Sequence, residues 1–273
     1  MSQAPSNADV ASIEPVEHLA LLDMYAAAPA DVRAALGIDH QAVDGGALLI
    51  CTGLDDLQFN RLTGQDVIAP ARADTLDRAL AAFERAGVRN WIVQVAPGAM
   101  DLQRMCDARG LVAHPRTWAK FVRDNTPAAA NTGLDVREIS PREADAFGGV
   151  VGQTYGLPAA AARWVSSLVG RANWHCLMAF DGATPVAAGA IHVNRPAAWL
   201  GLGATLTSHR RQGAQSALLA ARINTAARHG CEIMTTETGV PHAGEAGPSY
   251  RNIQKAGFRI AYLRPNLRRP EPA

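Results

Sequence analysis

The sequence is poor in cysteine, and its four cysteines show no spacing that suggests a metal site. None belongs to a C-x-x-C pair, and each lies within a run of apolar residues. Cysteines in such runs are usually buried, and thiols stay reduced in a reducing compartment. We therefore expect free, buried thiols and no bound metal for the four cysteines, Cys51, Cys106, Cys176 and Cys231.

An excess of charge of one sign is also missing, because 26 basic residues and 25 acidic residues leave a net charge of +1. Proteins that bind nucleic acid or a membrane surface usually concentrate basic residues, whereas the arginines here are scattered among acids. Lysine is scarce, with only Lys120 and Lys255, which we attribute to compositional bias of the genome. We expect a small-molecule partner, no nucleic acid and no membrane.

Long hydrophobic runs are absent, and nothing approaches the roughly 18 consecutive apolar residues of a membrane-spanning helix. Residues 1–15 lack the basic and apolar segments of a secretory signal. Their polar, proline-containing composition is typical of a flexible arm. We expect a cytoplasmic protein with a flexible arm at 1–15.

The sequence does contain enough apolar residues for more than one packed unit, at 48% of 273 residues. The stretch DNTPAAANTG, which ends at Gly133, has the small and polar composition of a linker. We therefore predict an N-terminal lobe at 16–125, a linker at 126–133 and a C-terminal lobe at 134–273.

The N-terminal lobe shows alternating strand and helix signals. Asp74 is placed to cap a helix that Gly87 ends. The preceding segment, TGQDVIAPARAD, has two acids and a proline but no arginine–glycine turn, so it is a poor cradle for an anion and we expect no cofactor there. The predicted helices lie at 18–25, 31–36, 75–86 and 102–108, and the predicted strands at 47–51, 59–62, 91–95 and 118–122.

The C-terminal lobe opens with a helix-start signal, because Ser140, Pro141 and Glu143 supply the N-cap, the first-turn proline and the acid of a capping box. Short turns, DGAT and NRP, join the three strands that follow, which indicates an antiparallel meander. The predicted order is a strand at 134–139, helices to about 151 and at 159–169, strands at 175–180, 185–193 and 199–205, then a helix, a strand at 231–236, a helix and a strand.

The stretch around which this lobe is organised, 198–230, reads as a strand, a tight basic turn and a helix. The turn contains Arg210, Arg211 and Gly213. N–H groups at a helix start lack intrahelical acceptors and lie at the positive end of the helix dipole, so this turn favours a pyrophosphate. In the helix that follows, apolar residues recur at helical spacing, and the predicted outer, polar face carries Gln215, Arg222, Thr225 and His229.

Two fragments of this lobe resemble motifs of the GCN5-related N-acetyltransferases. The sequence ATLTSHRRQGAQSALL is similar to the acetyl-CoA-binding motif Q/R-x-x-G-x-G/A, with Arg210 and Gly213 matching and Gln215 standing where the family has Gly or Ala. Residues 248–258 resemble the helix ending in x-G-F that lies along the pantetheine arm. The order of elements over 134–267 is also that of the family.

The resemblance implies an α+β fold with a mixed central sheet in two lobes, the first a degenerate copy of the second; an unrelated α/β lobe is the alternative. It implies an N-acetyltransferase that transfers an acetyl group from acetyl-CoA to a primary amine of a small molecule or peptide, by direct attack in a ternary complex. The implied cofactor-binding residues are Thr205, Leu206, Arg210, Arg211, Gln212, Gly213, Ala214, Gln215, Ser249 and Asn252.

The resemblance also suggests catalytic residues. Glu237, after the strand at 231–236, is the predicted general base, with a solvated carboxylate at a strand end as the alternative. The family's acid is a Tyr four residues before the Gly of G-F, and here that position is Ile253. Tyr250, one helical turn earlier, is the predicted acid; a packed aromatic, with proton return through water, is the alternative.

Other polar and aromatic residues have plainer interpretations. His242 and Glu245 lie in a loop that could fold over a substrate, but loop polarity is the simpler explanation. We expect His192 and the tryptophans of this lobe, Trp164, Trp174 and Trp199, to pack in the core.

Two plainer functions compete with catalysis. The first alternative is that the basic turn merely precedes a surface helix and binds nothing. A P-loop nucleotide site is not an alternative, because the pattern G-x-x-x-x-G-K-S/T is missing. The second alternative is a non-catalytic acetyl-CoA-binding or interaction protein, which Ile253 and Gln215 favour. The sequence predicts no oligomeric state.

Overall fold

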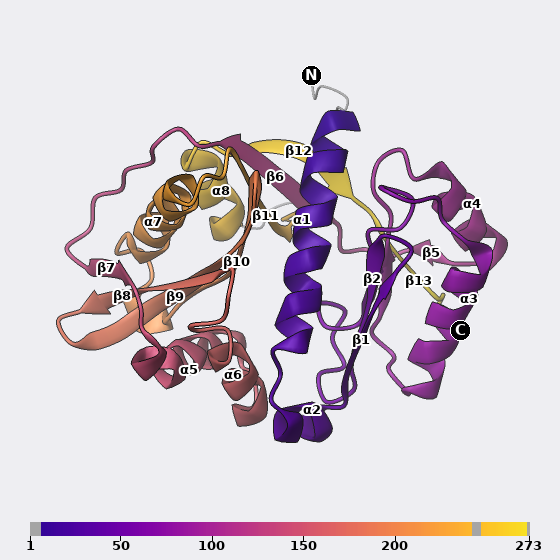
Figure 1. The fold of residues 1–273 in the computed structure, drawn as a ribbon, viewed down its shortest axis with the longest axis horizontal. Coiled ribbons are helices and arrows are strands. Elements are labelled where there is room, and N and C mark those ends of the chain that lie inside the picture. The colour runs from indigo at the N-terminus through magenta and orange to yellow at the C-terminus, as the bar shows by residue number, and fades with distance from the viewer. Residues whose placement is uncertain (1–6, 242–246, 272–273) are drawn as a thin grey trace.

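The computed structural model describes residues 7–241 and 247–271, which form two mixed sheets with helices around them (Figure 1). The fold is α+β with two lobes, as the sequence predicts. A long helix, α1 (Asn7–Ala26), stands between the two sheets. Within the described ranges, none of the helices combines the length and the hydrophobicity that a membrane crossing requires.

The first sheet has six strands in the order β1-β2-β3-β4-β13-β5. Apolar side chains of α3 (Ala73–Arg85) and α4 (Met100–Ala108) pack on it, and the ring of Phe83 stacks on Trp91 at 5.0 Å between centroids. The parallel pair in this sheet, β3 and β4, flanks α3 in sequence. The remaining elements of this lobe are α2 (Ala30–Leu36), β1 (Ile38–Val43), β2 (Gly46–Cys51), β3 (Arg61–Thr63), β4 (Ile92–Gln94) and β5 (Val112–Ala113).

The second sheet has seven strands in the order β12-β6-β11-β10-β9-β8-β7. Helices α7 and α8 pack on one face, and α5 and α6 pack with α1 on the other (Figure 1). The capping box from Ser140 to Glu143 is confirmed and begins a short 3-10 helix, Pro141–Glu143. The elements are β7 (Asp135–Glu138), α5 (Ala144–Tyr155), α6 (Ala159–Ser166), β8 (Trp174–Asp181), β9 (Thr184–Asn194), β10 (Ala197–Thr205), α7 (Ala214–Arg228), β11 (Ile233–Gly239), α8 (Pro248–Lys255) and β12 (Arg259–Arg264).

Two strands are exchanged between the lobes. β6 (Trp118–Asp124) precedes the expected linker, yet it lies in the second sheet, where it pairs with β11 and β12. β13 (Asn266–Arg268) comes after every element of the second lobe, yet it lies in the first sheet between β4 and β5. Sheet membership therefore does not follow the chain, and the lobe bounds at 16–125, 126–133 and 134–273 stay a prediction.

The flexible arm expected at 1–15 is wrong for residues 7–15, which form the first part of α1. The helix continues through Pro15. Its inner side is buried, because Val10 and Ile13 pack against Val122, Ala261 and residues beside them in β6 and β12. Burial against the second sheet supplies the stabilisation that composition alone does not reveal.

The plainer interpretations of the core residues are confirmed. All four cysteines are free and buried. Trp164, Trp174 and Trp199 are buried, and the indole N–H of Trp164 donates to the carbonyl oxygen of Met24 at 2.7 Å. His192 is buried edge-on against Trp174, with ring centroids 5.0 Å apart.

Candidate functional site

The neighbouring strands β10 and β11, in the middle of the second sheet, separate after a short paired stretch. They pair in parallel only from Ala197 to Trp199 of β10. The Thr236 hydroxyl then donates to the carbonyl oxygen of Leu200 at 2.7 Å, and beyond that bond no further pairing joins the two strands within the described chain. An unpaired strand edge presents N–H and C=O groups that a ligand can bond.

The backbone of β10 is irregular where the strands part. A bulge interrupts its pairing with β9 between Gly201 and Ala204, and Leu202 has a φ of 55°, which is unusual for a residue other than glycine. The N–H of Leu206 donates to Val186 in β9 at 3.0 Å, so it is used within the sheet. Since N–H groups alternate sides along a strand, the N–H of Thr205 points toward the open edge instead.

The expected basic turn follows β10 directly. A 3-10 turn at Thr207–His209 leads to Arg211 at φ 64° and Gly213 at φ 82°, and α7 begins at Ala214. Two consecutive arginines, Arg210 and Arg211, are exposed, and among the residues that the structure describes neither has an ion-pair partner. Their charges and the first N–H groups of α7 are therefore available to an anion.

The expected linker runs over this turn. A Cβ on Gly213 would stand 3.0 Å from the carbonyl oxygen of Asn131, so only glycine fits at this position with its left-handed backbone. Further along α7, the amide of Asn224 exchanges two hydrogen bonds with the backbone of Ala128, at 2.8 and 3.0 Å. The linker thus lies against α7 and the turn.

Gln215, which departs from the family motif, joins α7 to α8. Its amide nitrogen donates to the Ser249 hydroxyl at 3.2 Å, and its carbonyl oxygen accepts from Asn252 at 2.6 Å. All three residues belong to the predicted cofactor set. The structure brings them together at the N-terminal turns of the two helices, beside the basic turn.

Tyr250 lies in the first turn of α8 and packs edge-on against Phe121, with ring centroids 5.1 Å apart. Burial raises the pKa of Tyr250 above its usual value, which keeps the phenol protonated at neutral pH. Ile253, at the position where the family has Tyr, is buried in the core beneath α8. Tyr250 thus keeps a proton that it could donate, in a helix next to the predicted cofactor residues.

Glu237 does not lie free at a strand end. Its carboxylate pairs with Arg264 at 2.6 Å, Arg61 at 3.3 Å and Lys120 at 3.6 Å. Lys120 is opposite Glu237 in the β6–β11 ladder, whereas Arg61 comes from the first lobe. We call this buried group the seam cluster; its members, drawn from α1 and both sheets, are Glu14, Glu17, Arg61, Lys120, Glu237 and Arg264.

The seam cluster sets the protonation of Glu237. Burial by itself would raise the pKa of the carboxyl, but Lys120, Arg264 and Arg61 outweigh it and hold the pKa at about 2. Burial, with Arg264 nearby, lowers the pKa of Lys120 to about 8. A carboxylate held so strongly in its charged form is a weak proton acceptor. The role of Glu237 as general base stays a prediction, and this geometry weighs against it.

Sequence reasoning placed one important residue wrongly. Arg222 is not on the outer face of α7: it is buried, at 5% exposure, and donates to the carbonyl oxygen of Gly201 at 3.0 Å. Thr225 is buried as well. His242 and Glu245 lie outside the described residues. The sequence did hold one signal for a buried Arg222. Gly189 and Gly203, in strands that face this helix, leave room for its side chain.

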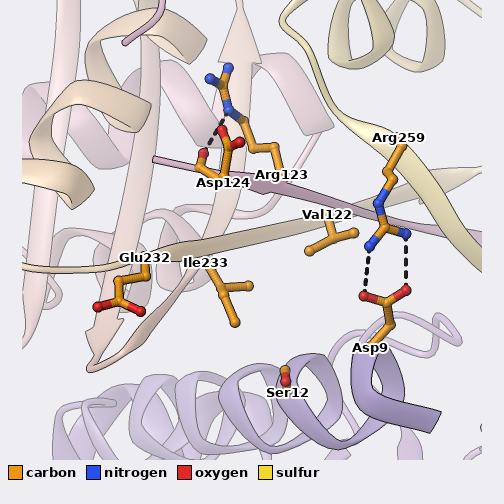
Figure 2. A pocket seen from close by; sticks show the side chains of 8 residues that line it. All are labelled: Asp9, Ser12, Val122, Arg123, Asp124, Glu232, Ile233 and Arg259. Carbon is orange, nitrogen blue, oxygen red and sulfur yellow. Dashed lines mark hydrogen bonds and ion pairs between the residues drawn. The ribbon is translucent and has the colours of Figure 1, made fainter. Parts of the chain in front are cut away.

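A cavity of about 420 Å³ lies elsewhere, between α1 and the ends of β6, β11 and β12 (Figure 2). Arg259 forms a two-pronged pair with Asp9 at its rim, and Arg123 donates to the backbone oxygen of Asp124 at 3.0 Å. Ile233, at the start of β11, lines it. The cavity is therefore at the opposite end of β11 from the point where β10 and β11 part.

Metal-ligating side chains gather at the far end of α7. Ligand atoms of Glu138, His175 and His229 lie within 4.8 Å of one another, and Nδ1 of His175 is 2.7 Å from the Glu138 carboxylate. A His–His–Glu set matches the ligands that zinc takes. The sequence-based expectation of no metal relied on cysteine spacing and did not consider this group.

In the first lobe, carboxylates lie near the starts of both helices, α3, which corresponds to α7, and α4. Asp66 accepts hydrogen bonds from the N–H of Ala71 and from the first turn of α4, at Asp101 and Leu102. Asp44 accepts from the hydroxyl of Thr75 in the first turn of α3. Asp66 thus takes the place of an anion at the start of α4, and Asp44 brings negative charge to the first turn of α3.

Known structures share this arrangement over nearly the whole chain. A GCN5-related N-acetyltransferase from Kribbella flavida aligns with a TM-score of 0.62 at 16% identity, covering 96% of this chain and 97% of its own. One from Sphaerobacter thermophilus aligns at 0.56 with 16% identity, covering 99% and 96%. A tandem GNAT protein from the clavulanic acid biosynthesis pathway aligns at 0.54 with 17% identity, covering 92% and 94%.

At the level of sequence, no model of a known protein family matches the chain, and no curated protein matches it. Identities of 16–17% establish a shared fold rather than a shared activity. The coverage of both lobes, with the parted strands and the basic turn in the second, supports one conclusion. This chain has the two-lobe fold of the tandem GCN5-related N-acetyltransferases.

Proposed function

We propose that the protein is a coenzyme A-dependent N-acyltransferase with acetyl-CoA as donor and an amine of a small molecule or peptide as acceptor. The observation that carries the proposal is the parting of β10 and β11 where β10 leads into the basic turn. The pyrophosphate would bind Arg210, Arg211 and the first N–H groups of α7. The pantetheine arm would follow the open edge of β10, where Thr205 offers its N–H.

The remaining predicted cofactor residues belong to the same surface. Gln212, Gly213 and Ala214 complete the turn. Leu206 lies beside the open edge, but its N–H is already bonded to Val186. The bridge of Gln215, Ser249 and Asn252 forms a polar wall between α7 and α8. We propose that this wall bonds the amide groups of pantetheine.

In the reaction, the neutral amine nitrogen attacks the thioester carbon while both substrates are bound. The C–N bond forms, the C–S bond breaks, the nitrogen loses one proton and the sulfur gains one, so coenzyme A leaves as a thiol. Backbone N–H groups of the β10 bulge would stabilise the oxyanion. The gain comes mainly from holding the two reactants in place.

Proton transfer is the least demanding part of this chemistry. We propose that Tyr250 returns a proton to the thiolate, because its phenol stays protonated in the first turn of α8. For the amine proton, Glu237 was the expected base, but its pKa of about 2 and its three cationic partners favour a water molecule as the acceptor. Glu237 then holds the seam cluster together.

The test is free-thiol release from acetyl-CoA with a panel of amines, alongside calorimetric titration with coenzyme A. We expect one coenzyme A per chain and amine-dependent thiol release. Failure to bind coenzyme A would reject the proposal.

The second candidate is a non-catalytic acyl-CoA-binding protein of the same fold. It is favoured by Ile253 at the usual Tyr position and by the ion-paired Glu237. Binding of coenzyme A without thiol release for any amine of the panel would support it over catalysis.

A further inference from the structure

Arg222 is a cation buried beneath the point where the two strands part. It leaves the inner face of α7 and crosses from β9 to β10 through space that two glycines provide. A Cβ on Gly189 would stand 2.9 Å from Nε of Arg222, and one on Gly203 would stand 3.3 Å from Nη2. The guanidinium therefore points along the sheet toward the open edge of β10.

Among the residues that the structure describes, no acid neutralises this guanidinium. Its hydrogen bonds go to the carbonyl oxygens of Gly201, at 3.0 Å, and Leu218, at 3.4 Å, and no carboxylate of the described chain forms an ion pair with it. Burial lowers the pKa of Arg222 only to about 10, so it stays charged at neutral pH. By contrast, three glutamates neutralise the cations of the seam cluster. A buried charge without a counter-charge is costly, and a ligand that supplies the opposite charge would offset that cost.

The carbonyls beside Arg222 belong to the irregular part of β10. Gly201 begins the bulge, Leu202 has the left-handed backbone, and the carbonyl oxygen of Gly203 accepts from the Tyr155 hydroxyl at 2.7 Å. Tyr155 comes from α5, on the opposite face of the sheet from α7. The bulge is thus bonded from both faces, with the guanidinium on one side of it.

The bulge lies where the reacting end of the cofactor would be. The basic turn, at Arg210, would hold the pyrophosphate, and the open edge of β10 runs back from Thr205 toward Gly201. Four residues of strand span about 13 Å, which is within the reach of an extended pantetheine arm. The acyl group and the attacking amine would therefore meet within reach of Arg222.

We propose that Arg222 binds a substrate carboxylate at the β10 bulge and so selects substrates that carry one; this inference rests on the proposed function. The carboxylate has two chemical sources. It can be the far end of a dicarboxylic acyl group, such as succinyl, that replaces acetyl on the donor, or the carboxylate of an amino acid or peptide acceptor. Guanidinium and carboxylate form two parallel hydrogen bonds, which gives direction as well as charge.

The carboxylate takes no part in the bond changes. The amine nitrogen still forms its bond to the thioester carbon, the C–S bond breaks, the nitrogen loses its proton to water, and the leaving thiolate gains one from Tyr250. The ion pair between Arg222 and the carboxylate changes only the position of the acyl chain or of the acceptor. Arg222 is therefore a specificity-determining residue in this reaction.

The donor arm compares acetyl-CoA with succinyl-CoA in thiol-release assays of the full chain. The acceptor arm compares amino acids and peptides with their C-terminal amides. We expect a preference for the carboxylate form in one arm, and we expect Arg222→Met to reduce that preference, measured as the ratio of kcat/KM for the carboxylate form to kcat/KM for the uncharged form, by about 10- to 100-fold. Arg222→Lys, which keeps the charge but loses the two-pronged geometry, should fall between the two.

Arg228→Met is the matched control, because Arg228 lies on the same helix but is exposed at its C-terminal end. It should leave the preference unchanged. Each variant is also titrated with coenzyme A and checked for its melting temperature, since Arg222→Met also removes a bond to the bulge. If Arg222 only supports the backbone, the charged and uncharged substrates will lose activity equally.

The outcomes separate the two proposals. If coenzyme A does not bind the wild type, the proposed function is rejected and this inference with it. If coenzyme A binds and thiol is released, but neither arm shows a preference for a carboxylate in the wild type, only the inference is overturned. The wild-type comparison needs no variant, so a folding defect in Arg222→Met cannot leave the question open.

Discussion

The two lobes use the same strand–helix–strand unit but differ in whether acids pair with the charges near the helix start. In the first lobe, β3 and β4 flank α3, and Asp44 and Asp66 supply the acceptors for nearby donors. In the second lobe, β10 and β11 flank α7, and within the described ranges neither Arg210 nor Arg211 pairs with an acid. The backbone of a helix start favours an anion in both cases. Side chains decide whether the protein or a ligand provides it.

The two parallel strand pairs also differ in how much of the first strand is left unpaired. The short β3 pairs with β4 at two of its three residues, whereas β10 leaves β11 after three residues and continues to Thr205. Only the second unit therefore combines an open strand edge with an uncompensated positive turn. This difference supports one cofactor site per chain, and it can be tested from both sides.

The largest effect is expected from the basic turn. Replacing Arg210 and Arg211 together with Ala should weaken coenzyme A binding by about 3–6 kcal/mol, if each arginine loses one charge-assisted hydrogen bond of about 1.5–3 kcal/mol. Arg72→Ala is the control, because Arg72 precedes α3 in the first lobe but pairs with Asp74. Calorimetry should show one site in the wild type. A stoichiometry near two, or an equal loss from Arg72→Ala, would break the comparison between the lobes.

The next effect concerns the seam cluster between the lobes. Glu237→Gln leaves buried cations without their carboxylate, so we expect a loss of about 3–5 kcal/mol in the free energy of unfolding. Glu232→Gln, at an exposed position just before β11, should change little. At temperatures where the Glu237→Gln variant stays folded, its kcat should be within about tenfold of wild type. A loss of about 100-fold or more in a fully folded variant would restore Glu237 as the general base.

The pH dependence of stability tests the same cluster. The pKa of Glu237 is lower in the folded protein, at about 2, than its ordinary value of 4.5. A lowered pKa means that the carboxylate stabilises the fold above about pH 4.5, and this contribution is lost progressively as the pH falls toward 2. Denaturant titrations between pH 6 and 3 should show that decline in the wild type. The Glu237→Gln variant should show a shallower one.

The smallest effect is expected at the start of α4, the second helix of the sheet in the first lobe. Asp66→Asn removes the charge but keeps a residue that tolerates the backbone φ of 61°. It should cost about 0.5–1 kcal/mol of unfolding free energy, because α4 loses a favourable charge at its first turn. No second coenzyme A site should appear in calorimetry. If one does, the carboxylate alone was keeping the first lobe empty, and the open strand edge is not required.

What the sequence could predict was local. The basic turn, the capping box at Ser140 and the helix after Gly213 are specified by neighbouring residues, and the structure contains all three. Periodicity assigned Arg222 to the outer face because it is charged. The glycines that make room for it, Gly189 and Gly203, lie in other strands, and a helical pattern does not register them.

The parts that could not be predicted depend on long-range contacts. Glu237 was expected after a strand at 231–236, but it lies within β11, and two of the three cations that lower its pKa, Lys120 and Arg61, are more than 100 residues away in sequence. The exchange of β6 and β13 could not be predicted either, because a strand pattern in the sequence does not indicate which sheet the strand joins. Tertiary packing decided both.

The exchanged strand β13 has a consequence for synthesis on the ribosome. The first sheet cannot be completed until residue 268 has emerged, because β13 fills the place between β4 and β5. While the second lobe is translated, β4 and β5 therefore lack the strand that pairs with them in the finished sheet. The strands of the second sheet end at Arg264, so the first sheet, although it begins earlier in the chain, is the one that is completed last.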